Sequence, residues 1–190
     1  MHRHFILFKP YGYLSQFIYE KKRHKKLLGE LYAFPEGTMA IGRLDEDSEG
    51  LLLLTTDGMM SERVRSKTVA KEYFAQVDGI ITPEAVEALQ NGVEIGFDGG
   101  KYKTKPCNAF IVTEIPDFGP RAKKIRDERH GPTSWASRAI NEGKFRQVRK
   151  MTAAVGFPTL RLVRVRIGNV YLQNLKAGEV LEVNDFQIND

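Results

Sequence analysis

The chain has 190 residues, of which 42% are hydrophobic and 10% aromatic, so it can bury a core and is not a disordered segment. Its 29 Lys and Arg against 24 Asp and Glu give a formal charge of +5, which excludes a histone-like coat but suits an enzyme that holds a polyanion. The single cysteine, Cys107, excludes an internal disulfide framework and favours a reducing compartment. The first apolar run is too short for a signal peptide, and no run reaches the roughly 20 residues of a membrane span, so we expect a cytoplasmic protein without membrane contact.

The first half of the chain is predicted to consist mainly of strands, because its apolar runs are short and bounded by turn residues. The expected strands are residues 5–9, 39–44, 51–56 and 71–77. Leu51 to Leu54 shows no alternation, which predicts a strand covered on both faces. A short helix is expected at residues 59–66, and the basic run at residues 21–26 is expected to be a solvated loop.

The clearest helix signal covers residues 82–91. Thr82 fits the N-cap, Pro83 fits the first helical position, and Gly92 supplies the stop. Val86 and Leu89 give this helix an apolar face.

The second half continues the mixture of strands with few helices. We expect strands at residues 102–113, 134–140, 160–170 and 179–183, a helix at residues 143–155, and a long basic loop at residues 116–132. Because strands and helices do not alternate regularly, the sequence predicts an α+β fold with a mixed, mostly antiparallel sheet. The whole chain is expected to form one domain, which two closely packed lobes could make up.

Positive charge gathers in residues 121–150, which hold ten basic residues against three acidic ones. On the helix expected there, Val148 and Met151 form an apolar stripe, whereas Arg146, Arg149 and Lys150 lie on the opposite side. Such a cluster is either a solvated face or the contact surface of an anionic partner such as phosphate.

The acidic segment at residues 42–50 has three interpretations. Asp45, Asp47, Glu49 and Gly50 fit the first half of a calcium loop, but Thr56 replaces its final acid. A pair of carboxylates for glycoside hydrolysis is the second. The third is a single carboxylate at a strand end that is held by an arginine and acts as a nucleophile.

Residues 43–55, Arg43-Leu-Asp45-Glu-Asp-Ser-Glu-Gly-Leu-Leu-Leu-Leu-Thr55, resemble the signature of the RNA pseudouridine synthases, in the branch that modifies ribosomal RNA. Residues 9–12 resemble that branch's first motif, residues 71–73 its second and residues 143–151 its third, all in the family's order. Residues 157–162 resemble one of its large-subunit groups. The branch usually carries a small N-terminal RNA-binding module, and here the first motif begins at Phe5, so none is expected.

The resemblance implies a role for several residues. Asp45 matches the family's nucleophile, which attacks either the base or the sugar of the target uridine. Arg149 matches the arginine that pairs with it, and Tyr73 matches the tyrosine that packs on the target base. Arg43 matches the arginine two residues before the nucleophile. In a strand, residues two apart point to the same side, so Arg43 is expected to lie beside Asp45 and to fill the gap left by the extruded nucleotide.

Lys9, Lys71, Arg146 and Lys150 are assigned to the RNA backbone or to local structure, and Arg164 is assigned to RNA binding. The resemblance also implies flanking helices, a central cleft and a single catalytic domain.

The sequence therefore predicts an enzyme that isomerises one flipped uridine of ribosomal RNA, of the large subunit, as a monomer and without metal or organic cofactor. Two alternatives stay open at this stage. One is a non-catalytic RNA-binding or ribosome-assembly protein on the same scaffold, and the other is a carboxylate hydrolase acting on nucleosides or sugars.

Overall fold

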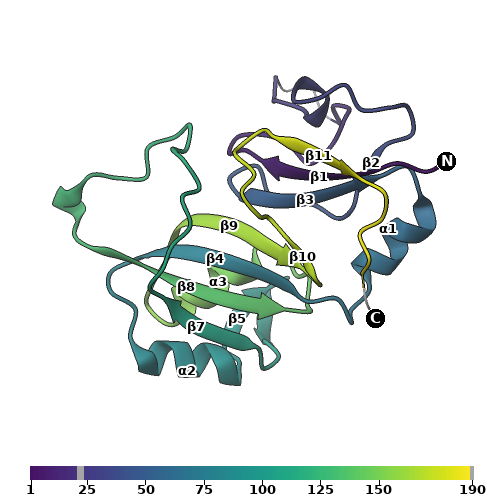
Figure 1. The fold of residues 1–190 in the computed structure, drawn as a ribbon. Coiled ribbons are helices and arrows are strands. Elements are labelled where there is room, and N and C mark those ends of the chain that lie inside the picture. Colours follow the sequence, from purple (N-terminus) through teal and green to yellow (C-terminus); the bar gives the residue numbers. More distant parts are fainter. Residues whose placement is uncertain (21–23, 189–190) are drawn as a thin grey trace. The chain divides into compact units, whose positions relative to one another are not determined.

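The computed structural model describes residues 1–20 and 24–188, and they form two compact units (Figure 1). The first unit contains residues 1–70, 118–123 and 163–190, and the second contains residues 71–117 and 124–162. The described residues include three α-helices, and all the strand pairs detailed below are antiparallel except one, so the α+β class and the mixed, mostly antiparallel pairing are confirmed.

The first unit is organised around β1 (His4–Lys9), which runs antiparallel to both of its neighbours, β3 (Glu49–Thr55) and β11 (Val180–Val183) (Figure 1). β2 (Met39–Ala40) pairs with the other edge of β3. β9 (Thr159–Ile167), whose end belongs to this unit, runs parallel to β3 and turns back into β10 (Val170–Tyr171).

Every residue of β1 and β3 is buried, and Leu51 to Leu54 are completely so. This confirms that the unalternating leucine run is covered on both faces. The short helix α1 (Gly58–Arg65) follows β3 and is capped by the Asp57 carboxylate, which accepts a hydrogen bond from the Met59 N–H at 2.9 Å. A single 3₁₀ turn, η1 (Leu28–Glu30), precedes β2.

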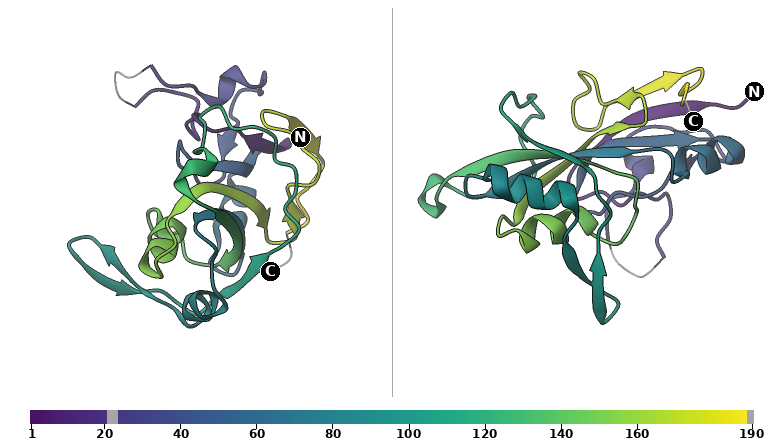
Figure 2. Two further views of the ribbon diagram at one scale, coloured as in Figure 1. Left: turned by 90° about the vertical axis from the view of Figure 1, so that its left-hand side faces the viewer. Right: turned by 90° about the horizontal axis from the view of Figure 1, so that it is seen from below.

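The second unit has a sheet of three antiparallel strands with β8 (Thr133–Ile140) in the centre, between β4 (Lys71–Asp78) and β7 (Asn108–Val112). Its core lies between one face of this sheet and two helices, α2 (Pro83–Asn91) and α3 (Gln147–Ala154). β5 (Glu94–Phe97) and β6 (Gly100–Lys103) form a separate hairpin, which extends away from the sheet in both views of Figure 2.

The cap of α2 is as predicted. The Thr82 hydroxyl accepts a hydrogen bond from the Ala85 N–H at 3.2 Å, and Gly92 ends the helix with a left-handed φ of 91°. A side chain at position 92 would meet the Thr104 carbonyl oxygen at 2.2 Å, so only glycine fits there.

Four predicted elements are longer than the structure makes them. The strand expected at residues 160–170 ends at Ile167, where a turn at residues 168–169 leads back into β10. The strand expected at residues 39–44 ends at Ala40, and the helix expected from residue 143 begins at Gln147, because Arg146 adopts a left-handed φ of 51°. The strand expected at residues 102–113 divides into β6 and β7. Pro106 lies between these two strands and has no N–H to donate, so it interrupts a continuous strand.

The basic loop is largely irregular as expected, apart from the 3₁₀ turn η2 (Glu128–His130). Of the basic run at residues 21–26, residues 21–23 lie outside the described part of the chain. Among the described residues, none of the helices combines the length and the apolar composition that crossing a membrane requires.

Candidate active site

Asp45 lies in the loop between β2 and β3 and is half-buried. Its carbonyl oxygen accepts a hydrogen bond from the Ser48 N–H at 3.0 Å, which closes a tight turn over residues 45–48. Directly after this turn, Glu49 and Gly50 begin β3 and are buried. The twelve-residue loop of a calcium site therefore does not form here, and among the described residues no three His, Cys, Asp or Glu side chains are grouped so as to hold a metal ion.

The first motif, together with Ser15 just after it, holds the chain on both sides of Asp45. The Leu44 N–H donates to the Ser15 hydroxyl oxygen at 2.9 Å, and that hydroxyl donates back to the Leu44 carbonyl oxygen at 2.8 Å. On the other side, the Gly12 N–H donates to the Glu46 carbonyl oxygen at 2.8 Å. Gly12 has a left-handed φ of 87°, which favours glycine at this contact. These bonds fix the backbone from which the Asp45 carboxylate projects.

Lys9 is completely buried in the same region. Its ammonium group donates to the carbonyl oxygens of Pro10 at 3.0 Å and Tyr13 at 2.8 Å. Burial lowers the pKa of Lys9 to about 8, although Glu49 and the other acids of the segment act in the opposite direction. A buried ammonium that bonds to backbone carbonyls fits the local structural role, because it has no exposed surface to offer RNA.

Arg43 is exposed on the same loop, with 70% of its side chain accessible and an ion pair to Glu20 at 3.2 Å. The expectation that Arg43 and Asp45 share one face of a strand is wrong, because β2 ends at Ala40 and the backbone from residue 41 to residue 48 is not in a strand. An exposed pair of this kind adds little stability, so Arg43 is free to move toward another anionic group.

Arg164 is buried in β9, with 4% of its surface exposed. Its Nε donates to the Leu51 carbonyl oxygen at 2.8 Å, and its backbone lies opposite Gly50. This placement ties the start of β3 to β9 and speaks against the direct RNA contact expected from the sequence.

In the second unit, Tyr73 lies on β4 opposite Arg138 of β8. Its half-buried ring packs against the core on the same face of the strand as Ala75 and Val77. Lys71 begins the same strand, opposite Ile140, and is also half-buried. The core supports the Tyr73 ring on one side. A ring that packs on a base needs such support.

The predicted cationic residues of α3 are all half-buried. Val148 and Met151 form the buried stripe as expected, and Arg149 lies between them in the sequence. Arg146 occupies the N-cap in its left-handed conformation, and its carbonyl oxygen accepts a hydrogen bond from the Lys150 N–H at 3.1 Å. The Lys150 ammonium donates to the Gly96 carbonyl oxygen at 3.0 Å, a contact that sequence reasoning did not anticipate.

A further candidate in the first unit was missed. The Arg121 guanidinium lies 4.6 Å from the centre of the Tyr11 ring, a cation–π contact that joins the basic loop to the first motif. The positive charge of the loop indicated that Arg121 could contact RNA. No local sequence pattern pairs Arg121 with Tyr11, because 110 residues separate the two.

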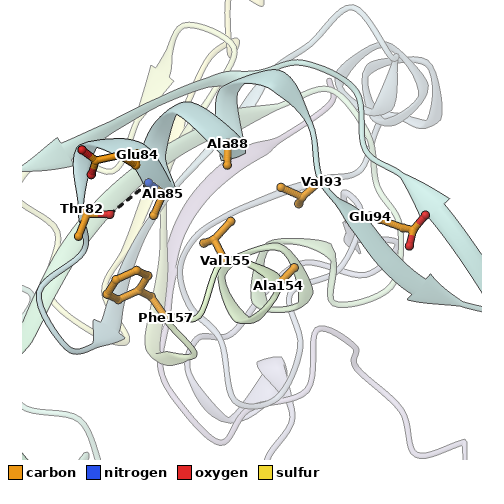
Figure 3. Close-up of a pocket in the computed structure, with 9 residues that line it drawn as sticks. All are labelled: Thr82, Glu84, Ala85, Ala88, Val93, Glu94, Ala154, Val155 and Phe157. Atoms are coloured by element: carbon orange, nitrogen blue, oxygen red, sulfur yellow. Dashed lines mark hydrogen bonds between the residues drawn. The ribbon is translucent and has the colours of Figure 1, made fainter.

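The second unit also has an open groove of about 610 Å³ beside α2 and the end of α3 (Figure 3). It is lined by Thr82, Glu84, Ala85, Ala88, Val93, Glu94, Ala154, Val155 and Phe157. None of the predicted catalytic or RNA-binding residues lines this groove.

Comparison with known proteins defines the class of protein. Residues 3–154 match the family described as RNA pseudouridylate synthase, so the chain belongs to that family and is an RNA pseudouridine synthase. A solved pseudouridylate synthase has the same fold, with a TM-score of 0.75 and 26% identity over 96% of this chain and 70% of that one.

Its similarity to curated relatives is more specific. It is 44% identical to ribosomal large subunit pseudouridine synthase E of Xanthomonas axonopodis pv. citri, over 90% of this chain and 88% of that protein. It is 42% identical to the protein of the same name from Vibrio vulnificus, over 96% of this chain and 76% of that protein. These findings confirm the family and the large-subunit group that residues 157–162 resemble.

Proposed function

We propose that this protein converts one specific uridine of large-subunit ribosomal RNA to pseudouridine, with Asp45 as the nucleophile. The observation that carries the substrate assignment is the 44% identity to a large-subunit synthase over 90% of the chain. The observation that supports Asp45 is its position on a loop whose backbone is held on one side by Ser15 and on the other by Gly12 of the first motif.

The reaction is an isomerisation and needs no net input of atoms. The bond between uracil N1 and ribose C1′ breaks, a bond between C5 and C1′ forms, N1 gains a proton, and the hydrogen on C5 leaves to solvent. A carboxylate that bonds covalently to the base or to the sugar divides this change into two easier steps. The uridine must first leave its helix, because the reacting atoms are inaccessible in a stacked pair.

The other residues have supporting roles in this proposal. Arg149 pairs with Asp45 and keeps the carboxylate ionised, because an adjacent guanidinium favours the charged form. Tyr73 packs on the flipped base, and Arg43 leaves its exposed pair with Glu20 to fill the gap in the RNA. Lys71, Arg146 and Lys150 hold the RNA backbone by charge.

The test is the release of tritium from uridine C5 of labelled ribosomal RNA, comparing wild type with Asp45→Asn and with the matched control Asp47→Asn. We expect release from large-subunit RNA with wild type and Asp47→Asn, and none with Asp45→Asn. Release from small-subunit RNA alone would contradict the substrate assignment. Full activity of Asp45→Asn would contradict the nucleophile.

Two further outcomes concern the alternatives. No release from naked RNA or from assembled subunits, together with retained RNA binding, would indicate a binding protein on a synthase scaffold. Turnover of free nucleosides that does not depend on the basic residues at 121–150 would indicate a hydrolase.

A further inference from the structure

An aromatic and cationic cluster in the second unit lies where the β5–β6 hairpin meets the start of α3. We call it the hairpin platform, and it consists of Phe97, Tyr102, Lys144, Phe145 and Lys150. The Lys144 ammonium lies 4.3 Å from the centre of the Tyr102 ring and 4.7 Å from that of Phe97. The Lys150 ammonium lies 5.5 Å from the Phe97 ring and 5.6 Å from the Phe145 ring. Cations and aromatic rings thus alternate across one surface.

The platform is held in place by a single carboxylate. Glu142 accepts hydrogen bonds from the Tyr102 hydroxyl, from the Gln147 side-chain amide at 2.7 Å and from the Lys105 N–H at 3.1 Å. Partial burial raises the pKa of Glu142, but these donors outweigh it and leave the pKa below its usual value. Glu142 is therefore ionised at neutral pH and ties the hairpin to the start of α3.

A strained residue completes this arrangement. Arg146 is not glycine, yet it has a φ of 51°, a conformation that costs free energy unless its surroundings enforce it. It directly follows Phe145, whose ring is 66% exposed. The turn thus presents a large apolar ring to solvent beside two lysines rather than burying it under α3.

The charge around the platform is positive. Lys144 and Lys150 carry this charge. Lys101 and Lys103 flank Tyr102 on β6, so their side chains lie on the opposite face of the hairpin, where Lys101 pairs with Glu94 at 2.9 Å. A rigid, exposed aromatic ring among several cations is the arrangement that binds single-stranded nucleic acid, since the ring stacks on a base and the cations pair with the flanking phosphates.

We propose that the hairpin platform stacks one unpaired base of the RNA on Phe145 and holds the adjacent phosphate with Lys150. This rests on the proposed function only in taking RNA as the partner. Lys144 lies between two rings and serves mainly to shape the platform. The contribution is to RNA affinity and not to the chemical step, because no proposed catalytic group belongs to the platform.

The first measurement is the affinity for a single-stranded RNA oligonucleotide and for a large-subunit RNA fragment, by fluorescence anisotropy. Phe145→Ala is expected to weaken both about 5- to 100-fold, which is the loss of one stacked base. Phe145→Trp should restore binding, and RNA should quench its added fluorescence. The matched control is Ile80→Ala, which removes an apolar side chain with 60% exposure elsewhere on the same unit and should change neither affinity.

The second measurement separates charge from stacking. Lys150→Ala should reduce the slope of log Kd against log salt by about 0.7, because it removes one phosphate contact, whereas Phe145→Ala should leave that slope unchanged. Unchanged RNA affinity of Phe145→Ala would overturn the platform. So would a loss confined to assembled ribosomal particles, because it would mean that Phe145 contacts protein.

The proposed function and the hairpin platform can be tested independently of each other. Asp45→Asn should abolish tritium release while keeping RNA affinity, and Phe145→Ala should weaken RNA affinity and thereby lower release at limiting RNA. If wild type releases no tritium but Phe145→Ala still weakens RNA binding, the function is wrong and the platform stands. If wild type is active and Phe145→Ala binds RNA like wild type, the function stands and the platform is wrong.

Discussion

Ser15 and Leu44 are joined by two reciprocal hydrogen bonds across 29 residues of sequence, one residue before Asp45. Both residues are buried, so neither water nor another group readily replaces the hydroxyl. Ser15→Ala is therefore expected to destabilise the protein by about 1–3 kcal/mol and to lower kcat more than RNA affinity, because the backbone that carries Asp45 loosens.

Denaturant unfolding and single-turnover tritium release would measure these two effects. The matched control is Ser66→Ala, since the Ser66 hydroxyl bonds to Thr68 two residues away, in an exposed position after α1. A stability loss without any change in kcat would show that the hydroxyl supports the fold but does not position Asp45.

Lys9 predicts a pH dependence of stability. In the folded protein burial lowers the pKa of Lys9 to about 8, below the 10.5 of a solvated lysine side chain. The unfolded chain therefore binds more protons between these two values, and the stability of wild type rises with pH in that window. Lys9→Met removes the titration, so the free energy of unfolding of wild type minus that of the variant should increase by about 2 kcal/mol from pH 7 to pH 9.5.

Urea unfolding of both proteins at several pH values would measure this difference, and groups that titrate in both proteins cancel. A difference that stays constant or falls with pH would mean that the ammonium is not buried in solution.

The parts of the fold that the sequence predicted are those with strong local signals. The leucine run of β3 and the Thr82 and Gly92 caps of α2 act over a few residues, and both were confirmed. The β5–β6 hairpin was missed because each strand has only four residues, most of them exposed, and lacks an apolar pattern. The early end of β2 was missed because the Leu44 N–H bonds to the distant Ser15 hydroxyl instead of a strand partner.

The candidate site shows the same division. The positions of Asp45, Tyr73 and Arg149 followed from motifs that resemble a family, and their catalytic roles stay predictions. The contacts that hold Asp45 in place were invisible in the sequence, because a serine and a lysine many residues away carry no pattern that names their partners. Lys9 and Arg164 illustrate the consequence, since a basic residue in a motif can be buried and bonded to backbone carbonyls.

Gly50 is predicted to be irreplaceable. It has a φ of 103°, and an added Cβ would lie 2.3 Å from the Arg164 carbonyl oxygen. Gly50→Ala must therefore strain the backbone and push β3 away from β9, and we expect a destabilisation of at least about 3 kcal/mol. Thermal unfolding would measure it.

The control is Gly58→Ala at the start of α1. No atom lies within 4 Å of an added Cβ there, and Gly58 has no positive φ. Its stability should be unchanged or slightly higher, because alanine favours helix. Equal stability of Gly50→Ala and wild type would contradict the close approach of β3 and β9.

Arg138 gives the opposite expectation, a gain of stability on removal. Its side chain is completely buried, and its one described hydrogen bond runs from Nη2 to the Cys107 sulfur at 3.2 Å. Among the residues that the structure describes, Nε and Nη1 have no hydrogen-bond partner, and burial lowers the pKa of the guanidinium. A buried cation with so few partners costs more in desolvation than it regains, so Arg138→Met should stabilise the protein by about 1–3 kcal/mol.

Denaturant unfolding would test this against Arg129→Met, which removes an arginine with an 87% exposed side chain and should change stability by less than about 0.5 kcal/mol. A loss of stability in Arg138→Met would mean that the guanidinium has strong partners in solution. Because Arg138 lies opposite Tyr73, the stabilised variant should also be assayed for tritium release. Lower activity in a more stable protein would mean that the buried charge is retained to orient the strand that carries Tyr73, and unchanged activity would leave Arg138 without a role in the reaction.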